Sequence, residues 1–390
     1  MRPDQPLAIL GGLTIEAFLR DYWQKKPLFV KNAMPAINGM ISPDELAGLS
    51  LEEDVESRII QEQPDNQWSL DHGPFPEDHF STLPESHWTL IVQAVDQHIP
   101  EFSQLLSQFD FIPSWRLDDI MITYATDQGS VGPHYDYYDV FLIQAEGHRQ
   151  WQVGQHCDEN SEILPELPVK VLEQFDVSNT WNVEPGDLLY LPPGLAHHGV
   201  ANGECMTMSV GFRAPSNKDM LSAYTDFQLD ALPDNQRYAD PDLLPQSNAG
   251  WISPTAIQQV KERLLSSIES PGALQNWFGQ YMSAAKYDDQ EPNEDNNYSV
   301  EDILSFCESD ATFIRDESSR LAYYGNTPND VDSLFVNGVN TQFPNASSPL
   351  VRLCCHARTL PADELASYLS QPQNLEFFLF LVNQGVFYPQ

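Results

Sequence analysis

The chain has 390 residues, 41% hydrophobic and 11% aromatic, which is enough apolar material for two or three domains of roughly 150 residues each. Its 57 acidic residues against 19 basic ones give a net charge of −38, which disfavours binding to a nucleic-acid backbone or an anionic membrane. The same charge would attract a basic partner, although solubility or adaptation to salty surroundings explains such acidity at least as often.

The chain contains five cysteines, and they form no C-x-x-C pair. Neither a disulfide framework nor a zinc ribbon is therefore expected. The longest apolar run is about six residues, far short of the roughly 20 that a membrane span requires. These features predict a soluble, cytoplasmic protein that contacts neither membrane nor nucleic acid.

Three helical patterns precede residue 100. Thr14 can cap a helix over 15–20, and Ser42 followed by Pro43 is typical of a helix start. The third pattern, at 84–98, places its apolar residues on one helical face.

From residue 115 the apolar period changes to two, and short strands are expected. They are predicted at 120–124, 139–143, 150–153, 187–191 and 206–210. Glycine and proline turns separate them, including one at Glu146-Gly147, and no helix-length pattern intervenes. The sequence therefore predicts a mainly β sandwich or barrel rather than a parallel sheet.

Helical periodicity returns at 218–232 and 254–285, with an apolar stripe that must pack on the barrel or on a second copy of the chain. The remaining residues read as a compact α+β unit with the element order of a winged helix, including a hairpin at Asn337-Gly338 and helices at 300–309, 362–370 and 374–383. The predicted divisions are a β domain with N-terminal helices at 1–214, a helical segment at 215–287, an acidic linker at 288–299 and the winged-helix unit at 300–390.

The most informative stretch is Gly132-Pro133-His134-Tyr135-Asp136. If it is a strand, His134 and Asp136 point to the same face. His197 follows another predicted strand and can complete a set of two histidines and one carboxylate, which leaves positions on Fe(II) open for a cosubstrate and O2. His198 competes for the third position but should point elsewhere, and the alternative is that these are core histidines.

Arg149 lies on the strand after the Glu146-Gly147 turn and can point into the barrel. There its guanidinium could pair with the distal carboxylate of 2-oxoglutarate, while His148 and Gln150 face away. The alternative is a surface arginine paired with one of many carboxylates. Thr123 and Tyr124 are weaker candidates to donate a hydroxyl to the same cosubstrate.

These residues resemble the motifs of the JmjC-type cupin oxygenases, and among them of the bacterial ribosomal oxygenases, which hydroxylate an arginine of the sixteenth protein of the large ribosomal subunit. The matching elements are Trp115–Asp119, Gly132–Asp136, Tyr138–Phe141, Arg149–Gly154, Glu184–Asp187, Pro192–His197 and Ser209–Pro215. The resemblance is strongest over about 15–215 and looser beyond.

The resemblance implies a JmjC or cupin double-stranded β-helix, a helical segment that forms a homodimer, and a C-terminal winged helix. It implies that His134, Asp136 and His197 bind Fe(II) and that Arg149 binds 2-oxoglutarate, which is converted with O2 to succinate and CO2. Ala125 departs from the pattern, because relatives carry there a serine that assists cosubstrate binding; Thr123 or a water could replace that hydrogen bond.

A substrate guanidinium needs acidic and aromatic walls. The candidates near the metal strands are Tyr137, Tyr138, Asp139, Asp118 and Asp119.

Two alternatives remain from the sequence. The same iron chemistry could hydroxylate a histidine or demethylate a lysine of another basic protein. A cupin sensor joined to a DNA-binding winged helix is disfavoured, because residues 294–390 contain four basic residues against thirteen acidic ones.

Overall fold

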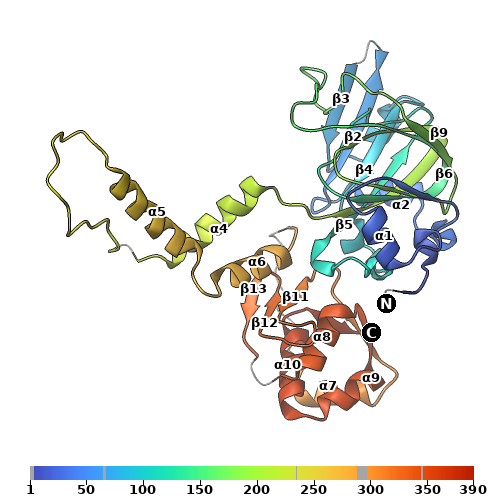
Figure 1. Cartoon of the computed structure of the whole chain (residues 1–390). Helices are drawn as coiled ribbons and strands as arrows, with labels where there is room; N and C mark the ends of the chain where they lie inside the picture. The colour runs from blue at the N-terminus through green and yellow to red at the C-terminus, as the bar shows by residue number, and fades with distance from the viewer. Residues whose placement is uncertain (1–3, 65–66, 234, 288–296, 344–345) are drawn as a thin grey trace. The chain divides into compact units, whose positions relative to one another are not determined.

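The computed structural model describes residues 4–64, 67–233, 235–287, 297–343 and 346–390. The chain divides into two compact units, Met1–Ala214 and Pro215–Gln390 (Figure 1). The predicted acidic linker at 288–299 lies outside the described residues apart from 297–299. Within the described residues, no helix is long and apolar enough to cross a bilayer.

The first two predicted helices are confirmed. Helix α1 spans Ile15–Asp21, and the Thr14 hydroxyl caps it by accepting from the Ala17 N–H. Helix α2 spans Pro43–Leu49, and Ser42 and Glu45 form a reciprocal capping box at its start. Strand β1, Leu28–Val30, lies between the two helices in the chain.

The predicted helix at 84–98 is wrong. This segment holds strand β4, Trp88–Val92, and a short 3-10 turn, Val95–Gln97. Strand β4 pairs with β2, Ser57–Gln63, and with β5, Leu117–Ala125. All five residues of β4 are buried, so its sequence shows no period-two alternation to distinguish it from a buried helix.

The predicted mainly β architecture is confirmed. In the described part of the chain, nine strands form one antiparallel sheet in the order β1-β8-β6-β9-β5-β4-β2-β3, with β7 paired to β6. The strands not yet given are β3 Gln67–His72, β6 Val140–His156, β7 Asn179–Val183, β8 Leu188–Leu191 and β9 Leu195–Phe212. The long strands β6 and β9 pair along most of their length, and the sheet curls on itself (Figure 1). Its interior contains a cavity.

Strand β6 contains a bulge where the sequence predicts a turn between two strands. Its register against β9 shifts on both sides of Glu146, and Gly147 adopts a left-handed φ of +63°. A Cβ at Gly147 would lie 2.1 Å from the Glu204 carbonyl oxygen. The bulge changes which face successive residues occupy, so that even-numbered Leu142 and odd-numbered Arg149 both face the cavity.

The second unit begins with three helices: α4 Asn217–Ala231, α5 Pro254–Ile268 and α6 Ala273–Ser283. The helix predicted over 254–285 is thus two helices, separated at Gly272, whose φ of +76° only glycine adopts readily. The Tyr224 hydroxyl donates to the Ile268 carbonyl, and its ring packs on Trp277 of α6.

The rest of the second unit has the mixed content predicted for a winged helix. Its elements are α7 Val300–Cys307, β10 Thr312–Arg315, β11 Leu321–Tyr324, β12 Ser333–Val336, β13 Val339–Thr341, α8 Ser348–His356, β14 Thr359–Pro361, α9 Ala362–Leu369, α10 Pro372–Asn383 and β15 Phe387–Pro389. Asn337 and Gly338 form the predicted hairpin turn, both with positive φ. Helix α6 packs on this hairpin, with Gly279 against Phe335.

Substituting Gly147 tests whether its close approach sets the bulge. Gly147→Val should lower the free energy of unfolding of the N-terminal unit by about 2 kcal/mol or more, because it combines a left-handed backbone with a clash against the Glu204 carbonyl. Gly203→Val is the matched control, since Gly203 has φ +75° with nothing within 4 Å of its Cβ position. Urea unfolding followed by tryptophan fluorescence compares the two; equal losses would contradict the argument.

Candidate metal centre and pocket

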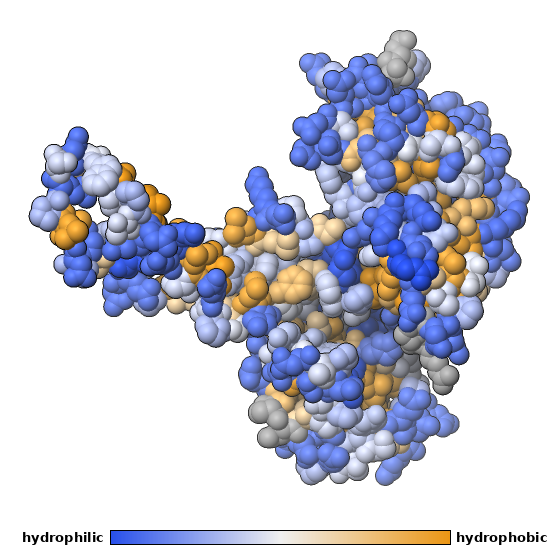
Figure 2. Space-filling view, viewed as in Figure 1, coloured by the Kyte–Doolittle hydropathy of each residue, from blue (hydrophilic) through white to orange (hydrophobic). Residues whose placement is uncertain are grey.

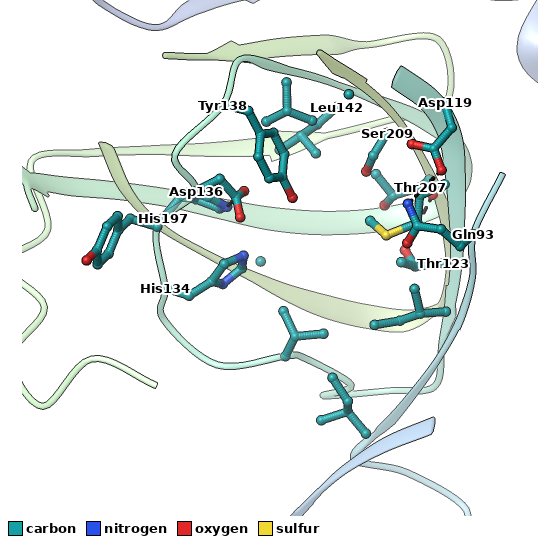
Figure 3. A pocket seen from close by; sticks show the side chains of 18 of the residues that line it. Gln93, Asp119, Thr123, His134, Asp136, Tyr138, Leu142, His197, Thr207 and Ser209 are labelled. Atoms are coloured by element: carbon teal, nitrogen blue, oxygen red, sulfur yellow. Dashed lines mark hydrogen bonds and ion pairs between the residues drawn. The ribbon is translucent and has the colours of Figure 1, made fainter. Parts of the chain in front are cut away.

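A cavity of about 370 Å³ lies inside the N-terminal unit, with walls formed largely by β5, β6 and β9. Figure 3 shows His134 and Asp136 at one end of this cavity and Thr123, Thr207 and Asp119 at the other. The cavity therefore has one end lined by groups that can bind a metal and another lined by hydroxyls and a carboxylate.

His134 and Asp136 lie in the irregular segment between β5 and β6, so the prediction that they share a strand is wrong. His134 is placed instead by a bridge to His197, the third residue of β9, and the Asp136 carbonyl accepts from the Gly194 N–H over 2.7 Å. The His134 N–H donates to the His197 carbonyl over 3.0 Å, and the His197 N–H donates back over 2.8 Å. Main-chain hydrogen bonds thus bring together two residues that are 63 positions apart.

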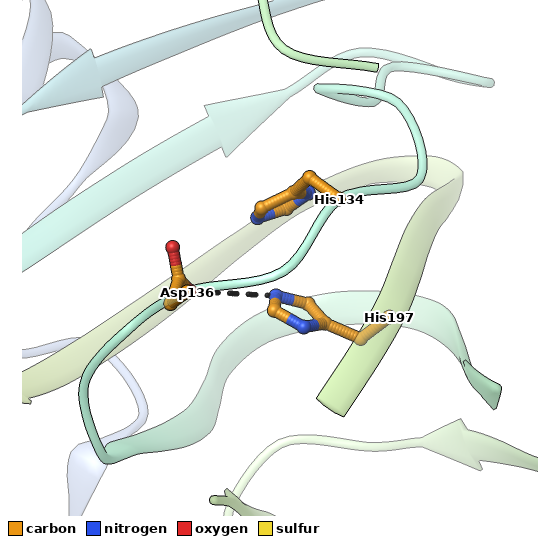
Figure 4. Close-up of side chains that lie close together, drawn as sticks. All are labelled: His134, Asp136 and His197. Carbon is orange, nitrogen blue, oxygen red and sulfur yellow. Dashed lines mark ion pairs between the residues drawn. The ribbon is translucent and has the colours of Figure 1, made fainter. Parts of the chain in front are cut away.

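The structure brings His134, Asp136 and His197 together as the sequence predicts (Figure 4). One ligand atom from each lies within 4.8 Å of the other two. The His197 Nε2 is 3.6 Å from the Asp136 Oδ2. Two imidazoles and one carboxylate form the donor set that binds Fe(II) on one face and leaves the other face open.

Both rings are oriented by hydrogen bonds to carbonyl groups. The His134 Nδ1 is 2.9 Å from the Gly132 carbonyl oxygen, and the His197 Nδ1 is 3.0 Å from the Leu195 carbonyl oxygen. A carbonyl only accepts, so each Nδ1 carries the proton, and each Nε2 presents a lone pair to the centre. Burial and the neighbouring His134 lower the pKa of His197 to about 4, which keeps this imidazole neutral and ready to ligate.

Arg149 is 4% exposed and lines the same cavity, while His148 and Gln150 on either side are exposed, as the sequence predicts. Its Nη1 donates to the Thr123 and Thr207 hydroxyls over 3.3 and 3.2 Å, and its guanidinium lies over the Trp151 ring. Within the described residues it forms no ion pair with a carboxylate, and its buried Nε has no partner. A buried cation with neutral neighbours is a receptor for an anion.

Comparison with known proteins identifies the family. Residues 104–220 match the JmjC domain, and residues 263–388 match the ROXA-like winged helix. The ribosomal protein uL16 3-hydroxylase of Escherichia coli is 32% identical over 95% of this chain and 96% of its own length. The chain belongs to the JmjC ribosomal oxygenases.

Other members agree along most of the chain. A probable ribosomal oxygenase of Haemophilus influenzae is 36% identical over 80% of both chains. The structure of the E. coli ribosomal oxygenase YcfD in complex with cobalt and 2-oxoglutarate matches with a TM-score of 0.83 and 32% identity, over 97% of this chain and 98% of that one. The bifunctional lysine-specific demethylase and histidyl-hydroxylase NO66 of Dictyostelium discoideum is similar over only 22% of this chain.

The two predicted cosubstrate contacts, Thr123 and Tyr124, lie on opposite faces of β5. Thr123 lines the cavity beside Arg149. Tyr124 does not, because the next residue along a strand points to the opposite face, where its ring packs near Trp88. Burial and the nearby Glu204 raise the pKa of Tyr124 to about 12. Ala125 packs in a small apolar cluster rather than on the cavity wall.

Asp139, predicted to contact substrate, is fully buried and does not line the cavity. Its carboxylate accepts from the Tyr190 hydroxyl at 2.7 Å and the Gln24 amide at 2.9 Å, and Arg116 lies 3.6 Å away. Desolvation raises the pKa of Asp139. This carboxylate fastens the segment after Asp136 to the body of the unit, so the predicted substrate contact is wrong.

The other predicted substrate contacts are placed in three ways. Tyr138 and Asp118 line the cavity, and Asp118 is 3.5 Å from the Arg213 guanidinium. Asp119 also lines it but is 3% exposed, and its carboxylate accepts from the side chain of Gln93 and the main chain of Ala94. Tyr137 lies outside the lining; it is 57% exposed, and its hydroxyl meets that of Tyr135.

Sequence reasoning missed several residues of the cavity. Thr207 accepts from Arg149 and donates to the Gln144 side chain. Arg58 and Lys170 add two more cations to the lining. The alternation of side chains along β9 predicts that Thr207 and Ser209 lie on the same face of the strand. It does not show which face points into the cavity.

Acid should destabilise the metal-free N-terminal unit through His197. Its pKa is about 4 when folded against about 6.5 when unfolded, so between these values the unfolded state binds more protons and stability rises with pH. The full shift corresponds to about 3 kcal/mol. His197→Asn should therefore reduce the slope of unfolding free energy against pH between 4 and 6.5, with the exposed His72→Asn as control. An unchanged slope in His197→Asn would contradict this.

Proposed function

We propose that the protein is an Fe(II)- and 2-oxoglutarate-dependent hydroxylase that adds a hydroxyl group to an arginine side chain of the large-subunit ribosomal protein uL16. The observation that carries the proposal is that His134, Asp136 and His197 share one cavity with Arg149. This arginine is buried, and no carboxylate of the described residues pairs with it. The overall reaction combines arginine, 2-oxoglutarate and O2 and yields hydroxyarginine, succinate and CO2.

The residues present fit the metal and the cosubstrate. His134, Asp136 and His197 would hold Fe(II) through two Nε2 atoms and a carboxylate oxygen. When bound, the iron supplies the redox chemistry that couples decarboxylation of 2-oxoglutarate to hydroxylation of an unactivated C–H bond.

The chain's own contribution is binding and orientation. Arg149 would pair with the distal carboxylate of 2-oxoglutarate, with Thr123 beside it to donate or accept a hydrogen bond. Trp151 and Leu142 add apolar surface to the cavity wall, which would help to keep water from the reacting end.

Substrate recognition depends on the net charge of the protein and on the residues that line the cavity. Asp118 and Tyr138 line the cavity and can hold a guanidinium through a carboxylate and an aromatic face. Tyr137 is exposed close by in the chain. A net charge of −38 favours the approach of a strongly basic ribosomal protein and disfavours nucleic acid as a partner. The proposed place of action is the cytoplasm, where ribosomal proteins are made.

Histidine hydroxylation and lysine demethylation would use the same iron site. The relatives named as demethylases and histidyl-hydroxylases match between about a fifth and about half of the chain, whereas both relatives named for ribosomal substrates match most of it. Arginine hydroxylation is therefore favoured.

Hydroxylation is tested with the full chain, Fe(II), 2-oxoglutarate, O2 and a basic uL16 peptide. Mass spectrometry should find a +16 Da arginine with an equal amount of succinate, and His134→Ala or Asp136→Ala should abolish both products while the protein remains folded. His72→Ala is the exposed control. Wild-type protein that gives neither product, or a product on histidine or lysine alone, would contradict the proposal.

The second unit exposes an apolar helix face that we propose as a homodimer surface. In the described chain, α5 has no buried residue, and its apolar side chains are exposed: Ile257 59%, Val260 41%, Leu264 61%, Leu265 39% and Ile268 46%. Figure 2 shows apolar side chains at the surface of the α4–α5 segment. A monomeric soluble domain seldom exposes such a stripe, so we infer that a second copy covers it.

Charged substitutions on α5 test this dimer. The double variant Ile257→Asp/Leu264→Asp should shift the protein from dimer to monomer in size-exclusion chromatography with light scattering, because burying two carboxylates in an apolar interface is unfavourable. Val339→Asp is the matched control, since Val339 of the hairpin is also 61% exposed. A dimer that survives the double variant, or is lost equally in the control, would contradict the inference.

A further inference from the structure

His198 follows the candidate ligand His197 on β9, yet it does not belong to the group of ligand atoms around the centre. Its Nε2 lies 2.9 Å from the Ser130 hydroxyl, in the segment that leads from β5 to His134. Burial lowers the pKa of His198 to about 4, so the imidazole is neutral. The two adjacent histidines of β9 thus reach two different groups on either side of the strand.

Ser130 connects His198 to the main chain ahead of His134. The serine is 1% exposed, and its hydroxyl accepts from the Gly132 N–H over 3.1 Å. The carbonyl of the same Gly132 accepts the Nδ1 proton of His134 over 2.9 Å. Hydrogen bonds therefore run from His198 through Ser130 and Gly132 to the ring that would bind the metal.

The conformation of Gly132 is what this connection fixes. Its φ is +80°, a left-handed value, and a Cβ there would lie 2.8 Å from the side chain of Val171. Rotation of this residue would turn its carbonyl away from the His134 Nδ1 and change the direction of the His134 Nε2. The hydrogen bond from its N–H to Ser130 resists that rotation.

The main chain of residues 129–134 is also hydrogen-bonded to β9. The Ala201 N–H donates to the Gly129 carbonyl over 3.1 Å, and the reciprocal pair between His134 and His197 follows. The side-chain pair of Ser130 and His198 lies between these two attachments. It adds a side-chain hydrogen bond to the main-chain hydrogen bonds that join the two parts of the chain carrying the candidate ligands.

We propose that Ser130 and His198 are positioning residues that hold Gly132, and through it the His134 ring, in the orientation required for metal binding. The inference rests on the proposed metal site and adds two residues to it. Groups that orient a ligating histidine typically change metal affinity by about 10- to 100-fold when they are removed.

Cobalt binding to the metal-free full chain tests the proposal without catalysis. Titration with Co(II) alone, followed by visible absorption, should show that Ser130→Ala and His198→Ala each weaken binding by about 10- to 100-fold. Because the two residues act in one chain of hydrogen bonds, the double variant should be no weaker than the weaker single variant. His198→Gln keeps a hydrogen-bonding group opposite Ser130 and should restore most of the affinity.

The chain offers a matched control in Ser86 and His87, an exposed pair whose Oγ and Nδ1 are 2.7 Å apart and which does not line the cavity. Ser86→Ala and His87→Ala should leave cobalt affinity unchanged. Unfolding temperatures of the metal-free variants separate loss of metal binding from loss of fold, and the less buried His198 gives the answer if Ser130→Ala does not fold.

Wild-type affinity in both single variants would overturn the proposal. So would losses that add in the double variant, or equal losses in the control pair. If the wild-type chain itself binds no cobalt, the proposed function fails and this inference fails with it, which distinguishes the two results.

Discussion

The buried positive charge of Arg149 is the constraint on which much of the N-terminal unit depends. Removing a guanidinium from water costs several kcal/mol when no counterion replaces the solvent, and no carboxylate of the described chain pairs with this one. The two threonine hydroxyls and the Trp151 ring offset only part of that cost. The chain has 38 excess negative charges, yet no carboxylate of the described residues pairs with Arg149. Its positive charge is therefore available to bind an anionic ligand.

The bulge in β6 is what makes Arg149 point into the cavity. Without it, the alternation that points Leu142 inward would point Arg149 away from the cavity. Gly147 permits the extra residue because only glycine fits both its backbone conformation and the approach of the Glu204 carbonyl. One glycine thus converts a surface position of the strand into the anion receptor of the pocket.

The candidate metal ligands are positioned by a different device. The main chains of His134 and His197 are hydrogen-bonded to each other, each ring is fixed through Nδ1 by a neighbouring carbonyl, and Asp139 anchors the end of the segment beyond them. Asp139, which the sequence suggests as a substrate contact, therefore helps to hold the segment that carries the candidate ligands.

Much of this could be predicted from local sequence, and the failures have physical reasons. Residue types and motif spacing sufficed for His134, Asp136, His197 and Arg149. Strand β4 resembles a helix in sequence because a strand buried on both faces has no alternating pattern.

For Tyr124 and Asp139, nearness in the chain to the metal-binding residues does not reveal which face the side chain occupies. Asp139 pairs with Gln24 and Tyr190, which are far away in sequence. Thr207 was missed for the same reason. Pairings between distant segments decide these positions, and a single sequence does not contain them.

Calorimetric titration of 2-oxoglutarate into the cobalt-loaded protein, without oxygen, tests the central claim most directly. Arg149→Gln should weaken binding by about 30-fold or more, since truncating one partner of a buried charge pair costs 2–5 kcal/mol. Arg58→Gln and Lys170→Gln change the other cations of the same cavity and should bind nearly as well as wild type. Unchanged affinity in Arg149→Gln, or an equal loss in either of the other two variants, would contradict the account.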